Sequence, residues 1–205
     1  MKKRKVVLLI AAICLCCLML CGCTSLQDML GEIFGVEKYE FGIVEGDIYT
    51  NPYFGVQFTV PENCSMLPAE ELVYEEEPDA DYEYSDVEAG ACTDDGLAYI
   101  YFHSDNVLPS ELEEYCNNTI TDFESSGYQV KESNGSASFA GKNYRKIAME
   151  IEEDGITVAD DMYFYQENAM VFVIEVVYLD AEGYEGLDAV LLEGVQSYEA
   201  PEASE

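Results

Sequence analysis

The ten residues AMVFVIEVVY, positions 169–178, decide the fold class. In an extended strand, successive side chains point to opposite faces, so this segment carries large apolar groups on both sides. One face has Met170, Phe172, Ile174 and Val176, and the other has Val171, Val173 and Val177. A strand of this kind is typical of the centre of a sheet that other elements cover on both faces.

Four further strand-like segments precede it, at positions 128–132, 136–139, 144–152 and 156–165. The links between them are short and contain Asn, Asp or Gly, which predicts hairpins and antiparallel neighbours. Ile147, Met149 and Ile151 alternate with other residues, so we expect one face of that strand to be buried.

The N-terminal half of the domain contains two predicted hairpins. The first joins residues 48–50 to residues 55–61, and the second joins residues 86–92 to residues 97–103 through a turn that ends at Gly96. Pro68 before residues 69–73 predicts a short helical turn between the hairpins.

Two longer helices are expected. The sequence Ser110-Glu111-Leu112-Glu113 matches a capping box, and Gly127 is a suitable helix end. The apolar side of this helix would be formed by Leu112, Tyr115, Cys116, Ile120 and Phe123. A closing helix is predicted at about residues 184–198, with Leu187, Val190, Leu191, Gly194 and Val195 on one side.

This order of elements predicts an α+β fold, in which helices pack on a mostly antiparallel sheet of about six or seven strands. The apolar residues are plentiful and periodic, so the composition does not indicate disorder.

The N-terminus carries export signals. Basic residues 2–5 precede an apolar run at residues 6–20, which has the length of a signal peptide. Leu20-Cys21-Gly22-Cys23 resembles the lipobox of bacterial lipoproteins. The resemblance implies that the Cys23 thiol takes a diacylglyceryl group, with palmitate as a typical acyl chain, and that cleavage follows Gly22. We therefore expect a lipid-anchored protein on the extracytoplasmic face of the cell membrane.

The predicted organisation has four parts: a signal peptide at 1–22, a lipidated N-terminus and tether at 23–46, a single globular domain at 47–198, and an acidic disordered tail at 199–205. Leu26, Met29, Leu30, Ile33 and Phe34 in the tether have helical spacing. They predict a short helix that is either folded onto the domain or loose.

The exported part is strongly acidic. All 42 Asp and Glu residues, but only five of the nine Lys and Arg residues, follow position 22, which gives a formal charge of −37. This charge excludes nucleic acid as a partner, because phosphate binding needs clustered Lys and Arg. An envelope protein or a cationic peptide fits better, and the charge also predicts a soluble monomer.

Part of the domain resembles a known family. The segments Tyr49-Thr50-Asn51, Tyr53-Phe54-Gly55-Val56 and Phe58-Thr59-Val60-Pro61-Glu62, followed by Glu70-Glu71-Leu72, are similar to the opening of PsbP-like domains in small bacterial lipoproteins. The likeness covers about residues 47–198, although Cys64 and the absence of Trp depart from the usual pattern. It implies an α/β/α sandwich and no particular activity.

Few residues suggest chemistry. His103, the only histidine, lies near Ser104 and Asp105, but we expect it to be an ordinary surface residue of a strand. Cys64 and Cys92 are candidates for one disulfide, and Cys116 fits a helix core. No cysteine pair has the close spacing of a structural zinc site, so no metal or cofactor is predicted.

Acidic side chains recur at Asp79, Asp81, Glu83, Asp86 and Glu88. The segment lacks the central glycine and the terminal glutamate of an EF-hand, so it predicts a solvated loop. Two function classes remain. The first is a non-catalytic binding or accessory module at the cell envelope, and the alternative is an extracytoplasmic hydrolase with an unrecognised carboxylate-based site.

Overall fold

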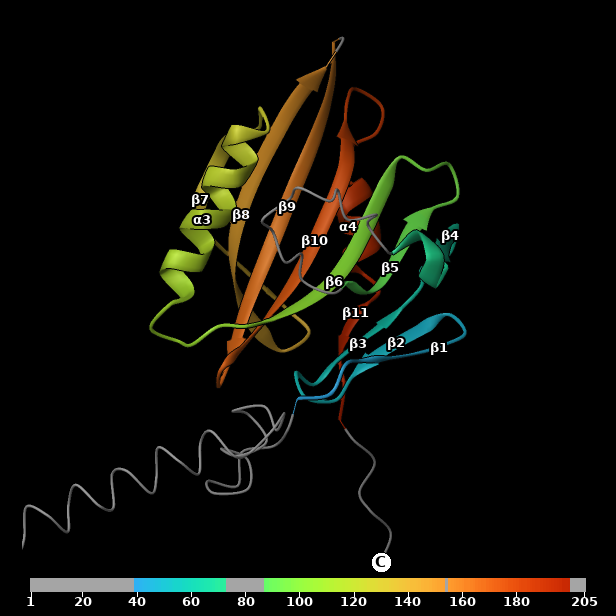
Figure 1. Ribbon diagram of the computed structural model, residues 1–205. Coiled ribbons are helices and arrows are strands. Elements are labelled where there is room, and N and C mark those ends of the chain that lie inside the picture. The colour runs from blue at the N-terminus through green and yellow to red at the C-terminus, as the bar shows by residue number, and fades with distance from the viewer. Residues whose placement is uncertain (1–38, 73–86, 154, 200–205) are drawn as a thin grey trace, which may run out of the picture. The chain divides into compact units, whose positions relative to one another are not determined.

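Strand β10 (Met170–Asp180) is the central strand of a seven-stranded sheet, as its alternation predicts (Figure 1). The structure is a computed structural model and describes residues 39–72, 87–153 and 155–199. The chain divides after Glu40, and the unit described here begins at Phe41. β10 pairs with β6 on one side and β9 on the other, and Met170, Val171, Phe172, Val173 and Ile174 are all buried.

The large sheet has the order β4-β5-β6-β10-β9-β8-β7, and a smaller sheet has the order β1-β2-β3-β11. The large sheet also contains β4 (Cys64–Met66), β5 (Val87–Thr93), β6 (Ala98–Asn106), β7 (Gln129–Phe139), β8 (Lys142–Glu153) and β9 (Ile156–Glu167). The small sheet contains β1 (Ile43–Glu45), β2 (Ile48–Asn51), β3 (Val56–Thr59) and β11 (Val195–Ser197). The helical elements are η1 (Ala69–Glu71), α3 (Leu112–Ser125) and α4 (Leu187–Leu192).

Every strand pairing among the described residues is antiparallel, which confirms the predicted α+β class. The two predicted hairpins are present as β2–β3 and β5–β6, and η1 follows Pro68 as expected. The seven strands of the large sheet also agree with the predicted number. The separate small sheet was not predicted as a unit.

Helix α3 covers one face of the large sheet, over β7 and β8 (Figure 1). Its Cys116 is fully buried among β8, β9 and β10 side chains. The predicted apolar side of the helix is confirmed, because the partly buried residues packed on this core are Leu112, Tyr115, Ile120, Phe123, Tyr128 and Val130.

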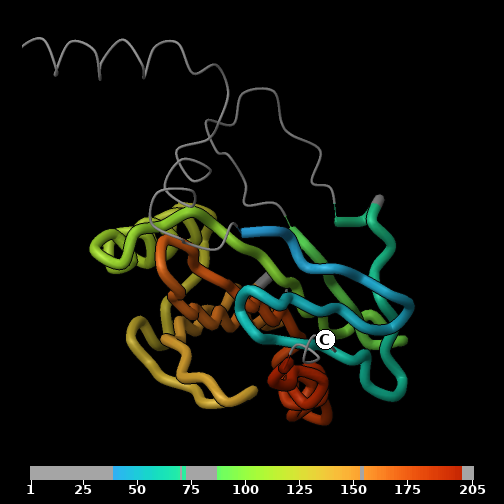
Figure 2. The backbone as a smooth tube through the Cα atoms, turned by 90° about the horizontal axis from the view of Figure 1, so that it is seen from below, coloured from blue at the N-terminus to red at the C-terminus, as the bar shows by residue number. Residues whose placement is uncertain are grey.

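The opposite face carries an aromatic core that joins the two sheets. Tyr49 and Phe58 of the small sheet stack on or tilt against Phe102 of β6, with ring centroids 4.8 and 5.1 Å apart. Phe54 stacks on Phe172 of β10 at 4.8 Å. Helix α4 packs against β6 and β10 as well, and Figure 2 shows it away from α3 in the view from below.

The prediction that the closing helix extends to about residue 198 was wrong. The helix ends at Leu192, and the chain continues as β11, which pairs with β3 through Val195 and Phe58. Gly194 permits this close approach, because a Cβ at this position would lie 2.5 Å from the Thr59 carbonyl oxygen. The Thr59 N–H donates to the Gly194 carbonyl at 2.9 Å.

Two local predictions also needed correction. Residues 128–132 and 136–139 belong to one strand, β7, because the Asn134-Gly135 link is absorbed by register shifts opposite β8. The capping box is not formed, since α3 begins at Leu112 and Glu111 makes no side-chain cap. The Glu111 carboxylate instead accepts a hydrogen bond from the Leu108 N–H at 3.3 Å.

Within the described residues, no helix combines the length and the hydropathy needed to cross a membrane.

Replacing Phe172 by alanine tests the role of the aromatic core. Phe172→Ala removes a fully buried ring from between Phe54 and Phe102, so we expect the free energy of unfolding to fall by about 3–5 kcal/mol. Urea unfolding followed by far-UV circular dichroism measures this loss. The control is Ile156→Ala, at an exposed strand position, which should change stability by less than about 1 kcal/mol. Equal losses in both variants would contradict the assigned core.

Candidate functional site

The β1–β2 hairpin forms one edge of the small sheet. It lies partly within the range predicted as a tether, since β1 covers Ile43–Glu45. Gly46 has a φ of 61°, and Gly46 and Asp47 form the two-residue turn that pairs Glu45 with Ile48. Glycine at the first position of such a turn suits the right-handed twist of the strands. Ile43 and Val44 before Gly46-Asp47, with Ile48 after them, are the sequence signal for this hairpin, and the predicted tether at 23–46 includes the first two of these apolar residues.

Exposed apolar side chains gather on this hairpin. Phe41, Ile43, Val44 and Ile48 are 54, 59, 43 and 37% exposed. They are four of the eight large hydrophobic residues that are exposed among the described residues. We call these four residues the β1 edge patch. Elsewhere the outer face of the small sheet is polar, with Thr50, Gln57, Thr59 and Gln196.

The hairpin is fixed to the large sheet through Glu88 of β5. The Glu88 Oε2 atom accepts hydrogen bonds from the Gly42 N–H at 2.7 Å, the Tyr49 hydroxyl at 2.7 Å and the Asn51 amide at 3.1 Å. Gly42 leaves room for the Tyr49 ring, because a Cβ at this position would lie 2.2 Å from it. These contacts hold the start of β1 in one position, so the β1 edge patch stands on a rigid support.

A second group of polar residues lies on the α3 side of the large sheet. His103 Nε2 and Glu175 Oε2 are 2.9 Å apart, and their side chains are only 11 and 14% exposed. Asp160 of β9 is almost fully buried and shares a side-chain hydrogen bond with Glu175. Burial raises the pKa of the Asp160 carboxyl well above 3.8, and the neighbouring Glu175 and Asp161 raise it further. We call these three residues the His103 cluster.

The prediction that His103 is a surface residue was wrong, because His103 is buried and its ring contacts Glu175 of the neighbouring strand β10. The neighbouring residues do not complete a catalytic triad. Ser104 is paired with Phe172 on the opposite face from His103, and Asp105 accepts a short hydrogen bond from the Tyr115 hydroxyl of α3. A carboxyl pair sharing a proton beside a histidine is nevertheless a chemical arrangement suited to proton transfer.

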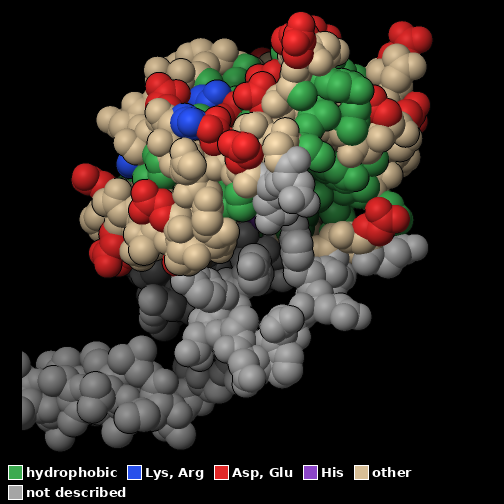
Figure 3. Space-filling view, turned by 90° about the horizontal axis from the view of Figure 1, so that it is seen from above, with side chains coloured by type: hydrophobic (Ala, Val, Ile, Leu, Met, Phe, Trp, Pro, Cys, Tyr) green, Lys and Arg blue, Asp and Glu red, His purple; other side chains and the backbone are tan. Residues whose placement is uncertain are grey.

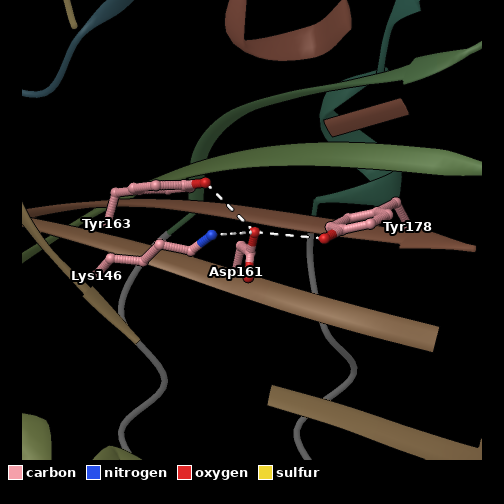
Figure 4. A network of polar contacts seen from close by, with 4 residues as sticks. All are labelled: Lys146, Asp161, Tyr163 and Tyr178. Carbon is pink, nitrogen blue, oxygen red and sulfur yellow. Dashed lines mark hydrogen bonds and ion pairs between the residues drawn. The ribbon is translucent and has the colours of Figure 1, made fainter. Parts of the chain in front are cut away.

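The cations of the described chain all lie on β7 and β8, namely Lys131, Lys142, Arg145 and Lys146. Figure 3 shows Lys and Arg side chains gathered in one part of the upper face, next to acidic ones. Figure 4 shows how Lys146 is used: its Nζ lies 2.7 Å from Asp161 Oδ2.

Two tyrosines complete the environment of Asp161. The hydroxyls of Tyr163 and Tyr178 each lie 3.4 Å from Asp161 Oδ2 (Figure 4). Burial, followed by the charge of Asp161, raises the pKa of both hydroxyls, so they remain protonated donors. The Asp161 carboxylate is therefore paired with the Lys146 ammonium group and accepts hydrogen bonds from two tyrosine hydroxyls, and we interpret this network as structural.

Cys64, Cys92 and Cys116 are free cysteines, so the candidate disulfide is not formed in the structure. Cys64 is paired with Thr93, and Cys92 is paired with Ser65. Because directly paired residues share a face and successive residues alternate, the two thiols point to opposite faces of the sheet. Burial raises the pKa of both thiols, and nearby acidic residues add to the shift.

Several predicted residues lie outside the described ranges. They are Gly22 and Cys23 of the lipobox, and Asp79, Asp81, Glu83 and Asp86 of the acidic loop. Among the residues that are described, no group of three or more His, Cys, Asp or Glu side chains is placed to hold a metal ion.

No protein-family model matches this chain, and no curated protein matches it. Several solved structures are similar. A protein of Bacteroides thetaiotaomicron has 9% identity and a TM-score of 0.44, over 77% of this chain and 50% of that one, so this chain spans half of its length.

LpqN of Mycobacterium tuberculosis, described as involved in cell envelope biogenesis, has 13% identity and a TM-score of 0.39, over 77% of this chain and 90% of that one. The Ran-binding protein Mog1p of Saccharomyces cerevisiae has 11% identity and a TM-score of 0.42, over 70% and 90% of the two chains. These likenesses are too distant to carry a functional argument, and the resemblance to PsbP-like domains stays a prediction.

The His103 cluster predicts a pH dependence of stability. The folded state holds the Asp160 proton more tightly than the unfolded state, so the free energy of unfolding should fall as pH rises above 3.8 through the raised pKa. Asp160→Asn removes this carboxyl and should flatten that part of the pH profile, measured by urea unfolding at a series of pH values. Asp180→Asn, at an exposed position of β10, is the control and should keep the wild-type slope. An unchanged slope in Asp160→Asn would contradict the assignment.

Proposed function

We propose that this protein is an extracytoplasmic lipoprotein, anchored to the cell membrane through Cys23, whose domain is a non-catalytic binding module of the cell envelope. The observation that carries the binding role is the β1 edge patch. Large contiguous apolar patches are rare on monomeric soluble proteins and usually mark interaction sites, and here Phe41, Ile43, Val44 and Ile48 are all exposed around one short hairpin.

The setting of the patch supports this role. Two other layers of the domain pack apolar side chains against the large sheet, α3 on one face and the aromatic core on the other. The β1 edge patch is not required for that core, because the ring of Tyr49 fills the inner face of the hairpin and is fully buried. Its apolar character therefore needs a reason outside the fold itself.

The anchor is supported by the sequence. The basic residues at 2–5, the apolar run at 6–20 and the Gly22-Cys23 junction follow one another in the order that lipoprotein processing requires. Two acyl chains on Cys23 would hold the domain at the membrane despite its acidic charge.

A second candidate function, an extracytoplasmic hydrolase, is favoured by the His103 cluster. Asp160 and Glu175 share a hydrogen bond beside His103, and acids with perturbed pKa values gather at catalytic sites. The burial of these three side chains leaves little surface for a substrate, so we rank this function second. Substituting Asp160 by asparagine would abolish a hydrolase activity and would leave a binding function intact.

Intact mass spectrometry of protein extracted from membranes tests the anchor. We expect a mature chain that begins at diacylglyceryl-Cys23, and we expect Cys23→Ala to leave the membrane fraction or to remain unprocessed. A wild-type protein that retains Met1 would contradict the proposed anchor.

Photo-cross-linking in living cells tests the binding role. A photoreactive residue at Ile43 should give a discrete cross-linked product, because this position lies in the β1 edge patch. The same residue at Ile156 is the matched control, since the two isoleucines are 59 and 54% exposed and both lie on strands. Products of equal yield at both positions, or none at Ile43, would argue against a binding surface at this edge.

A further inference from the structure

We infer that the β1 edge patch binds an extended, cationic segment of a partner protein, which adds to the small sheet as a fifth strand beside β1. This inference rests on the proposed binding function and specifies its mode and its partner.

The open edge of β1 is the first observation. Among the residues that the structure describes, β1 pairs with β2 on one side and no strand pairs with it on the other. Glu45 and Ile48 close a two-residue turn and therefore form a hydrogen-bonded pair. The next pair, Val44 and Tyr49, is then a non-hydrogen-bonded pair, so the backbone N–H and C=O of Val44 point toward the open side. An added strand would bond to these groups.

The distribution of apolar side chains over both faces favours a strand over a flat partner surface. Ile43 and Ile48 share the outer face of the hairpin with Glu45, as the register shows. Val44 is on the other face, opposite Tyr49, and is still 43% exposed. A flat surface could cover only one of these faces. A strand beside β1 would place alternate side chains against both faces at once.

Charge identifies the chemistry of the partner. Glu45 and Asp47 are exposed at the hairpin, beside the residues of the β1 edge patch. All the described cations lie on β7 and β8 of the other sheet, so none comes from β1 or β2. A segment with Lys or Arg beside apolar residues would complement this edge. A second copy would bring the same acidic residues and the same charge of −37. An anionic membrane surface would likewise be repelled.

The support beneath the hairpin lowers the cost of binding. Glu88 fixes Gly42, Tyr49 and Asn51 through three hydrogen bonds, so the position of β1 does not have to be ordered by the partner. The partner segment pays its own ordering cost, and the open edge offers it a prepared template.

The probe for this inference is a short fluorescent peptide in which lysine and valine alternate. Fluorescence anisotropy measures its binding to the mature lipoprotein in detergent. We expect saturable binding that weakens with salt, and about tenfold or greater weakening in Ile43→Lys. Ile156→Lys is the matched control for the added charge and should bind as the wild type does. A peptide N-methylated at every residue should fail to bind, because it lacks the N–H groups on both strand edges.

Several results would overturn the inference. Equal binding of the N-methylated peptide would exclude strand addition, and equal binding of an alternating glutamate–valine peptide would exclude a cationic partner. A dimer that Ile43→Lys dissociates would show that a second copy is the occupant. If the lysine–valine peptide does not bind while the Ile43 cross-link in cells persists, the inference fails and the proposed function stands. Loss of both the peptide binding and the Ile43 cross-link would contradict both the inference and the proposed binding function.

Discussion

The burial of β10 on both faces is the constraint on which the rest of the structure depends. Val171 and Val173 need the layer that contains α3, while Phe172 and Ile174 need the layer that contains the small sheet and α4. The second requirement explains why the short β2–β3 hairpin packs closely on the large sheet. Its Tyr49, Phe54 and Phe58 cover the aromatic side of β6 and β10. The β1–β2 hairpin is therefore part of the core on its inner face and is available for other contacts on its edge.

The central strands also bury acidic groups, and the charge of these groups is compensated differently on the two faces of the sheet. Asp160 and Asp161 are neighbours in β9 and point to opposite sides of the sheet. Asp161 has the ammonium group of Lys146 and two tyrosine hydroxyls. Asp160 has a carboxyl neighbour, so sharing a proton avoids the cost of two buried charges. One face thus neutralises its acid with a counter-ion and the other with a proton, and the raised pKa of Asp160 on the second face makes stability fall as pH rises.

The sequence predicted those features that depend on local alternation or on turn residues. The alternation of residues 169–178, the hairpin closed at Gly96 and the apolar side of α3 are all confirmed. The features that it missed depend on contacts between distant segments. β11 exists because Gly194 can approach Thr59, β1 is fixed by Glu88 from another sheet, and His103 is buried by a strand 72 residues away through Glu175. Periodicity within a segment contains no information about such partners.

The β1 edge patch combines an open strand edge with exposed apolar side chains, two properties that are seldom found together. Natural edge strands are commonly protected by charge or by covering elements, because open backbone groups beside apolar side chains invite aggregation. Here Glu45 and Asp47 supply the charge, while Ile43, Val44 and Ile48 remain exposed. Acidic residues repel other copies of the same acidic domain and attract a basic segment, so one arrangement protects against self-association and selects a partner. In a domain that served only as a spacer, the acidic charge would still prevent self-association, but the exposed apolar residues would have no function.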